Sequence, residues 1–166
     1  MYNELDILSV FFEDPDRNYS IREVARLTKI NPMTIRSFFL RFLKEGFLQR
    51  KEDSLYPLYI VDKQNQAYRN LKLYYTLEKL RKSQIISDLE AFYEYPVIIL
   101  FGSCARGIDV KQSDIDLFIV GNPDEGKIME QIEALEKRLQ REINYNVYPE
   151  KEFRERMKRR DTFLIN

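Results

Sequence analysis

The chain has 166 residues, of which 44% are hydrophobic and 33% charged, and its formal net charge is zero; this composition is typical of a soluble protein with one domain or two small ones. It contains no histidine and one cysteine, which excludes histidine-ligated zinc, Ser-His-Asp triads and an internal disulfide. No apolar run approaches the roughly 18 residues that span a bilayer, and the first residues lack the basic segment of a secretion signal, so we expect a cytoplasmic protein without a membrane partner.

Three helices are predicted in the first 46 residues. A helical pattern of apolar side chains indicates the first: Leu5, Ile7, Leu8, Phe11 and Phe12. Ser20 followed by Glu23 is typical of a helix start, and the buried face of this second helix is expected to contain Ile21, Val24, Ala25 and Leu27. Asn31 and Pro32 favour the start of a third helix, which Gly46 should end.

The residues after Gly46 predict two strands, Phe47–Lys51 and Leu58–Val61, around a polar turn. Two short helices joined by a tight turn and followed by such a hairpin resemble the winged helix-turn-helix family of DNA-binding domains. The resemblance implies that the third helix enters the major groove of double-stranded DNA. The side chains that would then meet DNA are Met33, Thr34, Arg36, Ser37 and Arg41 on this helix, with Arg50 and Lys51 on the hairpin contacting phosphate.

The charge distribution bears on this interpretation. Residues 1–82 contain 15 basic and 11 acidic side chains, whereas residues 83–166 contain 12 and 16. Between Ser20 and Lys51, eight basic side chains stand against two acidic ones. Such asymmetry hints at nucleic-acid contact, while a solvated basic face, or a domain that contacts another protein, stays open as the alternative.

Residues 63–93 predict a helical connector, since residues 64–93 contain neither glycine nor proline. The apolar side chains here fit one helix or two. Many of them are aromatic, and a wide aromatic stripe is more typical of a core or a dimer seam than of a ligand site. We therefore expect a homodimer with twofold symmetry.

Residues 94–166 place polar side chains between two apolar strands. The first strand is Val97–Phe101, and the second covers residues 114–120. Because residues two apart on a strand face the same side, Asp114 and Asp116 should point together. Two neighbouring carboxylates repel each other unless a cation lies between them, and Mg²⁺, a hard ion that prefers oxygen ligands, is the natural partner.

The polar residues before the second strand complete a motif. Gly102 and Ser103 can offer backbone amides and a hydroxyl to a phosphate, and Gly107 lets the loop come close. Phe101-Gly102-Ser103, a gap of about ten residues and Asp114-Ile115-Asp116-Leu117 resemble the signature of the nucleotidyltransferase superfamily that includes DNA polymerase beta. The residues of both motifs are most similar to those of the small prokaryotic minimal nucleotidyltransferases.

This second resemblance implies a reaction and a set of roles. In that family, aspartates hold one or two Mg²⁺ ions that bind a nucleoside triphosphate, a hydroxyl attacks the α-phosphate, and pyrophosphate leaves. Carried over to this sequence, Asp114 and Asp116 are the metal ligands and catalytic residues. The nucleotide would be bound by Gly102, Ser103, Arg106 and Gly107.

One residue departs from the family pattern. Members that catalyse usually supply a third carboxylate from a later strand, and at the corresponding place of the predicted strand 142–148 stands Asn144. An amide can ligate a metal through its carbonyl oxygen, but it cannot act as a base. This replacement would leave nucleotide binding intact and slow or abolish transfer, and neither Glu142 nor Glu150 has a physical warrant as its substitute.

The sequence thus predicts an α+β protein with a winged helix-turn-helix domain over residues 1–62, a connector over 63–93 and a nucleotidyltransferase-like domain with a mixed sheet over 94–166. Three functions stay open. The first is Mg²⁺-dependent transfer of a nucleoside monophosphate to a hydroxyl. The second is a DNA-binding transcriptional regulator whose nucleotidyltransferase-like domain is inactive or only senses nucleotide. The third, implied by the second resemblance, is an antitoxin-type partner of a small helical toxin.

Overall fold

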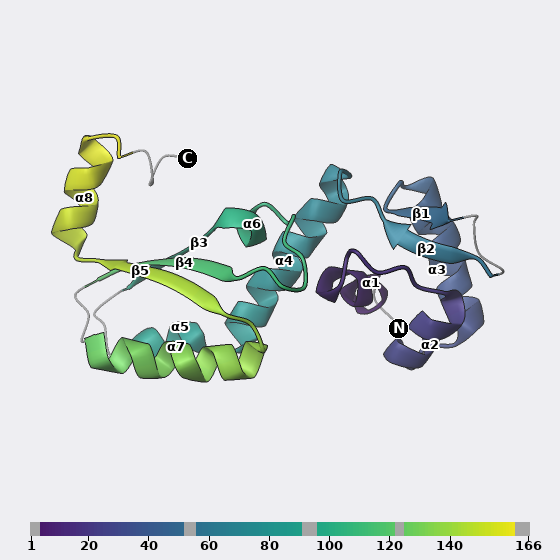
Figure 1. The fold of residues 1–166 in the computed structure, drawn as a ribbon, viewed down its shortest axis with the longest axis horizontal. Helices are drawn as coiled ribbons and strands as arrows, with labels where there is room; N and C mark the ends of the chain where they lie inside the picture. The colour runs from purple at the N-terminus through teal and green to yellow at the C-terminus, as the bar shows by residue number, and fades with distance from the viewer. Residues whose placement is uncertain (1–3, 52–55, 91–95, 122–124, 162–166) are drawn as a thin grey trace. The chain divides into compact units, whose positions relative to one another are not determined.

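The structure, a computed structural model, describes residues 4–51, 56–90, 96–121 and 125–161 (Figure 1). The chain divides into two compact units, one of Met1–Thr76 with Arg106–Gln112 and one of Leu77–Ala105 with Ser113–Asn166. Helices combine with two small sheets, so the predicted α+β class is confirmed. The predicted boundary between residues 93 and 94 lies outside the described residues, and the division into three parts stays a prediction.

The first unit begins with three helices: α1 (Glu4–Glu13), α2 (Ile21–Thr28) and α3 (Pro32–Lys44). The Ser20 hydroxyl accepts a hydrogen bond from the Glu23 amide at 3.2 Å, and the Asn31 side chain accepts one from the Met33 amide at 2.8 Å. These side chains satisfy amides that have no partner inside their own helices. The two helices therefore begin where the sequence predicts.

A two-stranded antiparallel sheet follows, formed by β1 (Leu48–Lys51) and β2 (Leu58–Val61). The core of the first unit draws on the three helices and this sheet: Ile7, Leu8, Phe11, Phe12, Val24, Ile35, Phe39, Phe42, Leu48 and Tyr59. Leu27, expected in the buried face of α2, is 52% exposed, because that face is centred on Val24 and Ala25 and Leu27 lies to one side of it. The assignment of the unit to the winged helix-turn-helix family stays a prediction.

The predicted connector forms two helices, α4 (Gln66–Lys82) and α5 (Ile85–Glu90). Gln84, with φ of 66°, separates them, because a left-handed backbone conformation cannot continue a right-handed helix. Residues of α4 up to Thr76 belong to the first unit, and those from Leu77 belong to the second.

The segment Arg106–Gln112 packs within the first unit. Lys72 of α4 and Asp109 are both buried, and Lys72 Nζ lies 3.3 Å from Asp109 Oδ1 and also donates to the Asp109 backbone carbonyl. Gly107 has φ of 62°, and a Cβ atom there would lie 2.2 Å from the Arg69 carbonyl oxygen. Only glycine tolerates both conditions, so this segment is anchored on α4 by an ion pair and a close backbone contact.

The second unit contains a three-stranded sheet in the order β3 (Val97–Phe101), β4 (Ile115–Val120) and β5 (Ile143–Tyr148). The central strand β4 is antiparallel to β3 and parallel to β5. A parallel pair requires a crossover connection, which α7 (Glu125–Leu139) provides.

Helices cover the sheet unequally. One face packs against α5 and α7 (Figure 1), with a core of Leu89, Ile115, Leu117, Ile119, Ile128, Ile132, Leu135 and Ile143. The short α6 (Gly102–Ala105) directly follows β3, and α8 (Glu150–Lys158) follows β5. On the other face, the Phe118 ring contacts Phe153 of α8 at a centroid distance of 5.6 Å. None of the helices in the described part of the chain is long and apolar enough to cross a membrane.

Candidate functional site

Three polar side chains meet at the end of the second unit's sheet where β4 and β5 begin. Asp116 of β4 pairs in register with Asn144 of β5, and Asp114 directly precedes β4. Asn144 Nδ2 lies 3.0 Å from Asp114 Oδ2 and 3.5 Å from Asp116 Oδ1, and it donates a hydrogen bond to each. The two carboxylates therefore point toward one place, as alternation along an extended chain requires, and the Asn144 amide lies between them.

The Asn144 amide separates two like charges. Ionised carboxylates only accept hydrogen bonds, so the amide turns its NH₂ group toward Asp114 and Asp116, which reduces their mutual repulsion. A divalent cation would have the same effect more strongly, because its charge is larger and its preferred ligands are oxygens. For a cation at this place, Asn144 would have to rotate its amide and present Oδ1.

The donor set fits a magnesium ion. Two carboxylates and one amide oxygen are hard ligands, and Mg²⁺ is commonly held by one or two carboxylates together with water and substrate phosphates. Among the described residues, no group of three His, Cys, Asp or Glu side chains is placed to hold a metal. Water and phosphate oxygens would therefore have to complete the coordination of an ion bound between Asp114 and Asp116.

Gly102 lies directly against one of these carboxylates. Its neighbour Phe101 pairs in register with Asp116, and a Cβ atom at Gly102 would lie 2.1 Å from Asp116 Oδ2 and 3.0 Å from its Cγ. The φ of Gly102 is 69°, a conformation that L-residues with side chains rarely adopt. Position 102 therefore requires glycine for two independent reasons, and the Gly-Ser turn is held at the carboxylate pair.

The remaining residues predicted to bind nucleotide lie in two places. Ser103 follows Gly102 in α6 and belongs to the same unit as the carboxylates. Arg106 and Gly107 belong to the first unit, where Arg106 is exposed and Gly107 packs against the backbone of Arg69. The absence of a side chain at Gly107 thus has a packing reason, and the nucleotide-binding roles of Arg106 and Gly107 stay predictions.

Sequence reasoning missed one residue that contacts the site's backbone. Arg141, in the turn between α7 and β5, donates from Nε to the Ser113 carbonyl at 2.9 Å and from a terminal nitrogen to the Asp114 carbonyl at 3.3 Å. The same nitrogen lies 3.3 Å from Cys104 Sγ. No sequence motif signals such contacts, because they join a side chain to backbone atoms 27 and 28 residues away.

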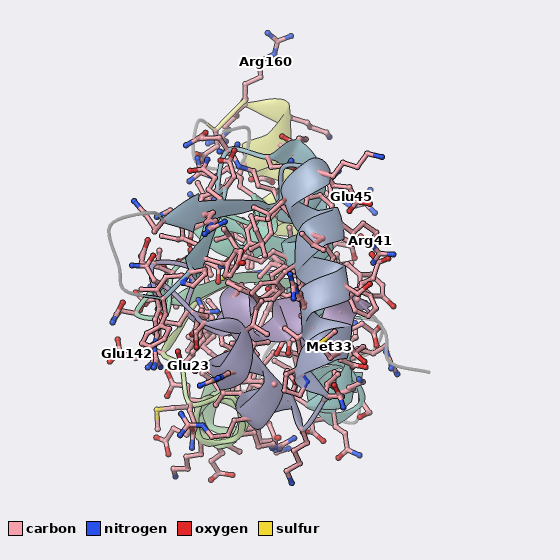
Figure 2. The ribbon with its side chains drawn as sticks, turned by 90° about the vertical axis from the view of Figure 1, so that its right-hand side faces the viewer. Glu23, Met33, Arg41, Glu45, Glu142 and Arg160 are labelled. Atoms are coloured by element: carbon pink, nitrogen blue, oxygen red, sulfur yellow. The ribbon has the colours of Figure 1, made fainter. Side chains whose placement is uncertain are left out.

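The side chains predicted to meet DNA belong to α3 and β1 of the first unit, and Figure 2 labels two of them, Met33 and Arg41, on α3. Met33 is 69% exposed, and Arg36, Ser37, Arg50 and Lys51 are also exposed, whereas Thr34 is half-buried. Arg41 pairs with Glu4 and Glu45 and lies over the Phe38 ring at 4.9 Å. Exposed basic side chains are thus present on both elements, and Arg41 is engaged within the unit.

Comparison with known proteins gives one finding. Residues 82–164 match the model of the nucleotidyltransferase domain family. This range is about half of the chain and includes Gly102, Asp114, Asp116 and Asn144. No curated protein and no solved structure shows a significant match to the chain.

Proposed function

The chain belongs to the nucleotidyltransferase domain family, and on that premise we propose that it binds a magnesium–nucleoside triphosphate and transfers a nucleoside monophosphate to a hydroxyl group. One observation carries the proposal. The carboxylates of Asp114 and Asp116 converge on one donor atom of Asn144, and Gly102 leaves no room for a side chain beside them. Carboxylates held together at a cost in repulsion are typical of a cation site.

Each residue has a role in this proposal. Asp114 and Asp116 hold the ion, and Gly102 and Ser103 bind the triphosphate. Magnesium, when bound, neutralises charge on the phosphates and on the departing pyrophosphate. In the transfer, the acceptor oxygen forms a bond to the α-phosphorus, and the bond from that phosphorus to the bridging oxygen breaks. Pyrophosphate carries away the electron pair of the broken bond, and the hydroxyl proton passes to water.

The fate of that proton favours a second candidate function. Asn144 cannot accept a proton, and it lies where it contacts both carboxylates. If no other base serves the acceptor, nucleotide would bind and transfer would be slow. The alternative is therefore a protein that senses a nucleoside triphosphate without transferring it.

The first unit adds a proposed DNA contact. Arg36 on α3 and Arg50 and Lys51 on β1 are exposed, and exposed basic side chains give salt-dependent affinity for phosphate. Arg41 is a weaker candidate because Glu4 and Glu45 already pair with it. A regulator that combines DNA binding with nucleotide sensing would use both units.

Labelling separates the enzyme from the sensor. The protein is incubated with Mg²⁺, a cell extract and each of ATP, GTP, CTP and UTP carrying a radioactive α-phosphate. We expect covalent label on an acceptor with the wild type and with Glu133→Gln, which neutralises an exposed acid on α7, and none with Asp116→Asn. Nucleotide binding without transfer supports the sensor, and failure to bind any of the four nucleotides contradicts both functions.

A further inference from the structure

Asp114 and Asp116 are held in place by different means. Asp116 lies within the sheet, with Phe101 on one side and Asn144 on the other in register. Asp114 lies one residue outside the sheet, whose ladder to β5 begins at Ile115. The sheet therefore fixes the backbone of Asp116, and something else has to fix the backbone of Asp114.

Arg141 provides that second support. Its guanidinium donates to the carbonyl oxygens of Ser113 and Asp114, from Nε at 2.9 Å and from a terminal nitrogen at 3.3 Å. A guanidinium is planar, always charged and able to donate in two directions at once. It can therefore hold two successive carbonyl groups in a fixed relation, which a single ammonium group does less well.

Cys104 extends this support to α6. Its buried thiol donates to the Asp114 carbonyl at 3.4 Å, and Arg141 lies 3.3 Å from the same sulfur atom. Cys104 is two residues after Gly102 in α6. One guanidinium thus contacts the backbone before β4 and the short helix that contains the Gly-Ser turn.

Glu142, directly after Arg141, also contacts the start of β4. The Ile115 amide donates to the Glu142 carbonyl at 2.9 Å, directly after Arg141 in the chain. Arg141 and Glu142 therefore bind three consecutive residues, 113–115, at the point where the chain enters β4. Removal of the guanidinium should loosen the start of β4 without removing any ligand from the carboxylate pair.

From these contacts we propose that Arg141 is a positioning residue that sets the Asp114 carboxylate for cation binding. The proposal rests on the proposed function, since it assumes that the carboxylate pair binds a divalent ion. The contacts of Arg141 that carry this inference are those to the backbone carbonyls of Ser113 and Asp114, so we expect it to act on the carboxylate through that backbone. Its loss should therefore lower cation affinity while the ligands themselves remain.

Manganese binding tests the proposal, with Mn²⁺ as the probe and electron paramagnetic resonance of the free ion as the measurement. We compare the wild type with Arg141→Lys, Arg141→Met and Arg138→Met. Arg138 is the matched control, because it is a nearby arginine, in the last turn of α7, and also donates to a backbone carbonyl, that of Ser83. We expect Arg141→Met to weaken Mn²⁺ binding by about 10-fold or more, as for residues that orient metal ligands, Arg141→Lys to weaken it less, and Arg138→Met to leave it unchanged.

Hydrogen exchange gives a readout that needs no metal. In metal-free protein, we expect the Ile115 amide to exchange faster in Arg141→Met than in the wild type. The amides of β4 from Leu117 onward should keep their wild-type exchange rates in this variant. In Arg138→Met, the amides near Ile115 should also keep their wild-type exchange rates. Faster exchange with weaker Mn²⁺ binding supports the positioning role, because a general loss of stability would move the whole strand.

Several results would overturn the proposal. The first is an Mn²⁺ affinity in Arg141→Met equal to that of the wild type, and the second is an equal loss of Mn²⁺ affinity in Arg141→Met and Arg138→Met. If Arg141→Met does not fold, an Mn²⁺ affinity in Arg141→Lys equal to that of the wild type is the third. If the wild type binds no Mn²⁺, the proposed function fails separately. The exchange rate of Ile115 then decides alone whether Arg141 holds the Asp114 backbone.

Discussion

At the scale of single residues, Asn144 decides how much negative charge the site carries. Its amide contacts both carboxylates and is neutral, so the site has two negative charges where a third carboxylate would give three. A metal ion would be held less strongly by two charges than by three. The replacement also leaves the metal-free protein with less repulsion.

Asn144→Asp should strengthen metal binding and increase the repulsion between the carboxylates in the metal-free protein. Without metal, the third carboxylate lacks the amide donor and repels the other two, so we expect a lower melting temperature and a loss of about 1–3 kcal/mol of folding stability. With Mg²⁺, the rise in melting temperature should exceed that of the wild type, because binding to the folded state alone stabilises it.

Asn146→Asp is the control for the added charge. Asn146 lies two residues further along β5 and is exposed, and it pairs in register with Phe118 instead of an aspartate. Thermal unfolding with and without Mg²⁺ provides the comparison. Equal Mg²⁺ responses of the two variants would contradict a metal site beside Asn144.

Gly102→Ala should damage the site through sterics alone. The new Cβ would lie 2.1 Å from Asp116 Oδ2, in a residue with φ of 69°, so either the backbone or the carboxylate must move. We expect a loss of about 1–3 kcal/mol in urea unfolding and weaker nucleotide binding. Gly126→Ala, at an exposed position of α7, should instead be neutral or stabilise by at most about 1 kcal/mol; similar losses for both variants would contradict the steric account.

Parts of the site could be predicted from sequence because short-range rules govern them. Alternation along a strand predicts that Asp114 and Asp116 point together, and the hydrogen bonds from Asn144 agree. The contacts of Arg141 could not be predicted, because a bond to a backbone carbonyl 27 residues away depends on the packed structure. The reason for glycine at position 107 was equally hidden, since its neighbour is the Arg69 backbone.

At the scale of secondary structure, the buried Tyr68 of α4 packs against α1. The Tyr68 ring lies 5.3 Å from that of Phe12, and its hydroxyl donates to the Phe11 carbonyl at 3.2 Å. Burial raises the pKa of Tyr68 well above 10.0, and the charges of Asp109 and Asp16 raise it further. Tyr68 therefore stays protonated in the folded protein at pH values where an unfolded tyrosine is ionised.

This raised pKa predicts alkaline instability. Between pH 10 and the raised pKa, the folded state binds more protons than the unfolded state, so the free energy of unfolding falls as pH rises. Below pH 10, Tyr68 makes its full contribution to the free energy of unfolding. Tyr68→Phe should show a smaller fall above pH 10, and at neutral pH it should lose about 0.5–1.5 kcal/mol with its hydrogen bond.

Urea unfolding between pH 8 and pH 11 measures this dependence. Tyr75 should preserve part of it, because burial and the hydrogen bond to Glu13 raise its pKa too. Tyr74→Phe, at an exposed position of α4, is the control and should behave like the wild type. An unchanged pH dependence in Tyr68→Phe would contradict the assignment.

The limits of helices and strands followed the sequence where local chemistry determines them. Ser20 and Asn31 accept bonds from amides at the starts of α2 and α3, as their residue types predict. The break between α4 and α5 is different, because Gln84 carries no helix-ending signature and the sequence left one helix or two open. Leu27 was predicted wrongly, since periodicity marks a face but not how much of it the neighbours cover.

At the scale of the whole molecule, the uneven charge predicts a measurable response to salt. Residues 1–82 contain 15 basic and 11 acidic side chains, and the proposed DNA contacts lie there. Affinity for double-stranded DNA should fall steeply with salt, with a logarithmic slope of about −0.9 for each phosphate contacted. Arg50→Met should reduce the magnitude of this slope by about one.

Fluorescence anisotropy at several salt concentrations measures the slope. Arg154→Met is the control, because Arg154 is an exposed arginine of α8 that pairs with Glu150, outside the proposed DNA contacts. Arg50→Met and Arg154→Met should therefore differ. Identical slopes, or wild-type binding that salt does not affect, would contradict DNA binding through β1.

The segment Arg106–Gln112 limits how residues 1–76 can be deleted or exchanged. Its residues pack with the first unit although those on either side of it belong to the second. A deletion of the first 76 residues would remove Lys72, whose Nζ lies 3.3 Å from Oδ1 of the buried Asp109, and the loss of a partner from a buried charge destabilises a fold. The half that matches the nucleotidyltransferase family therefore contains a residue that packs with the first unit. A recombinant that exchanges residues 1–76 should keep lysine at position 72 or replace Lys72 and Asp109 together.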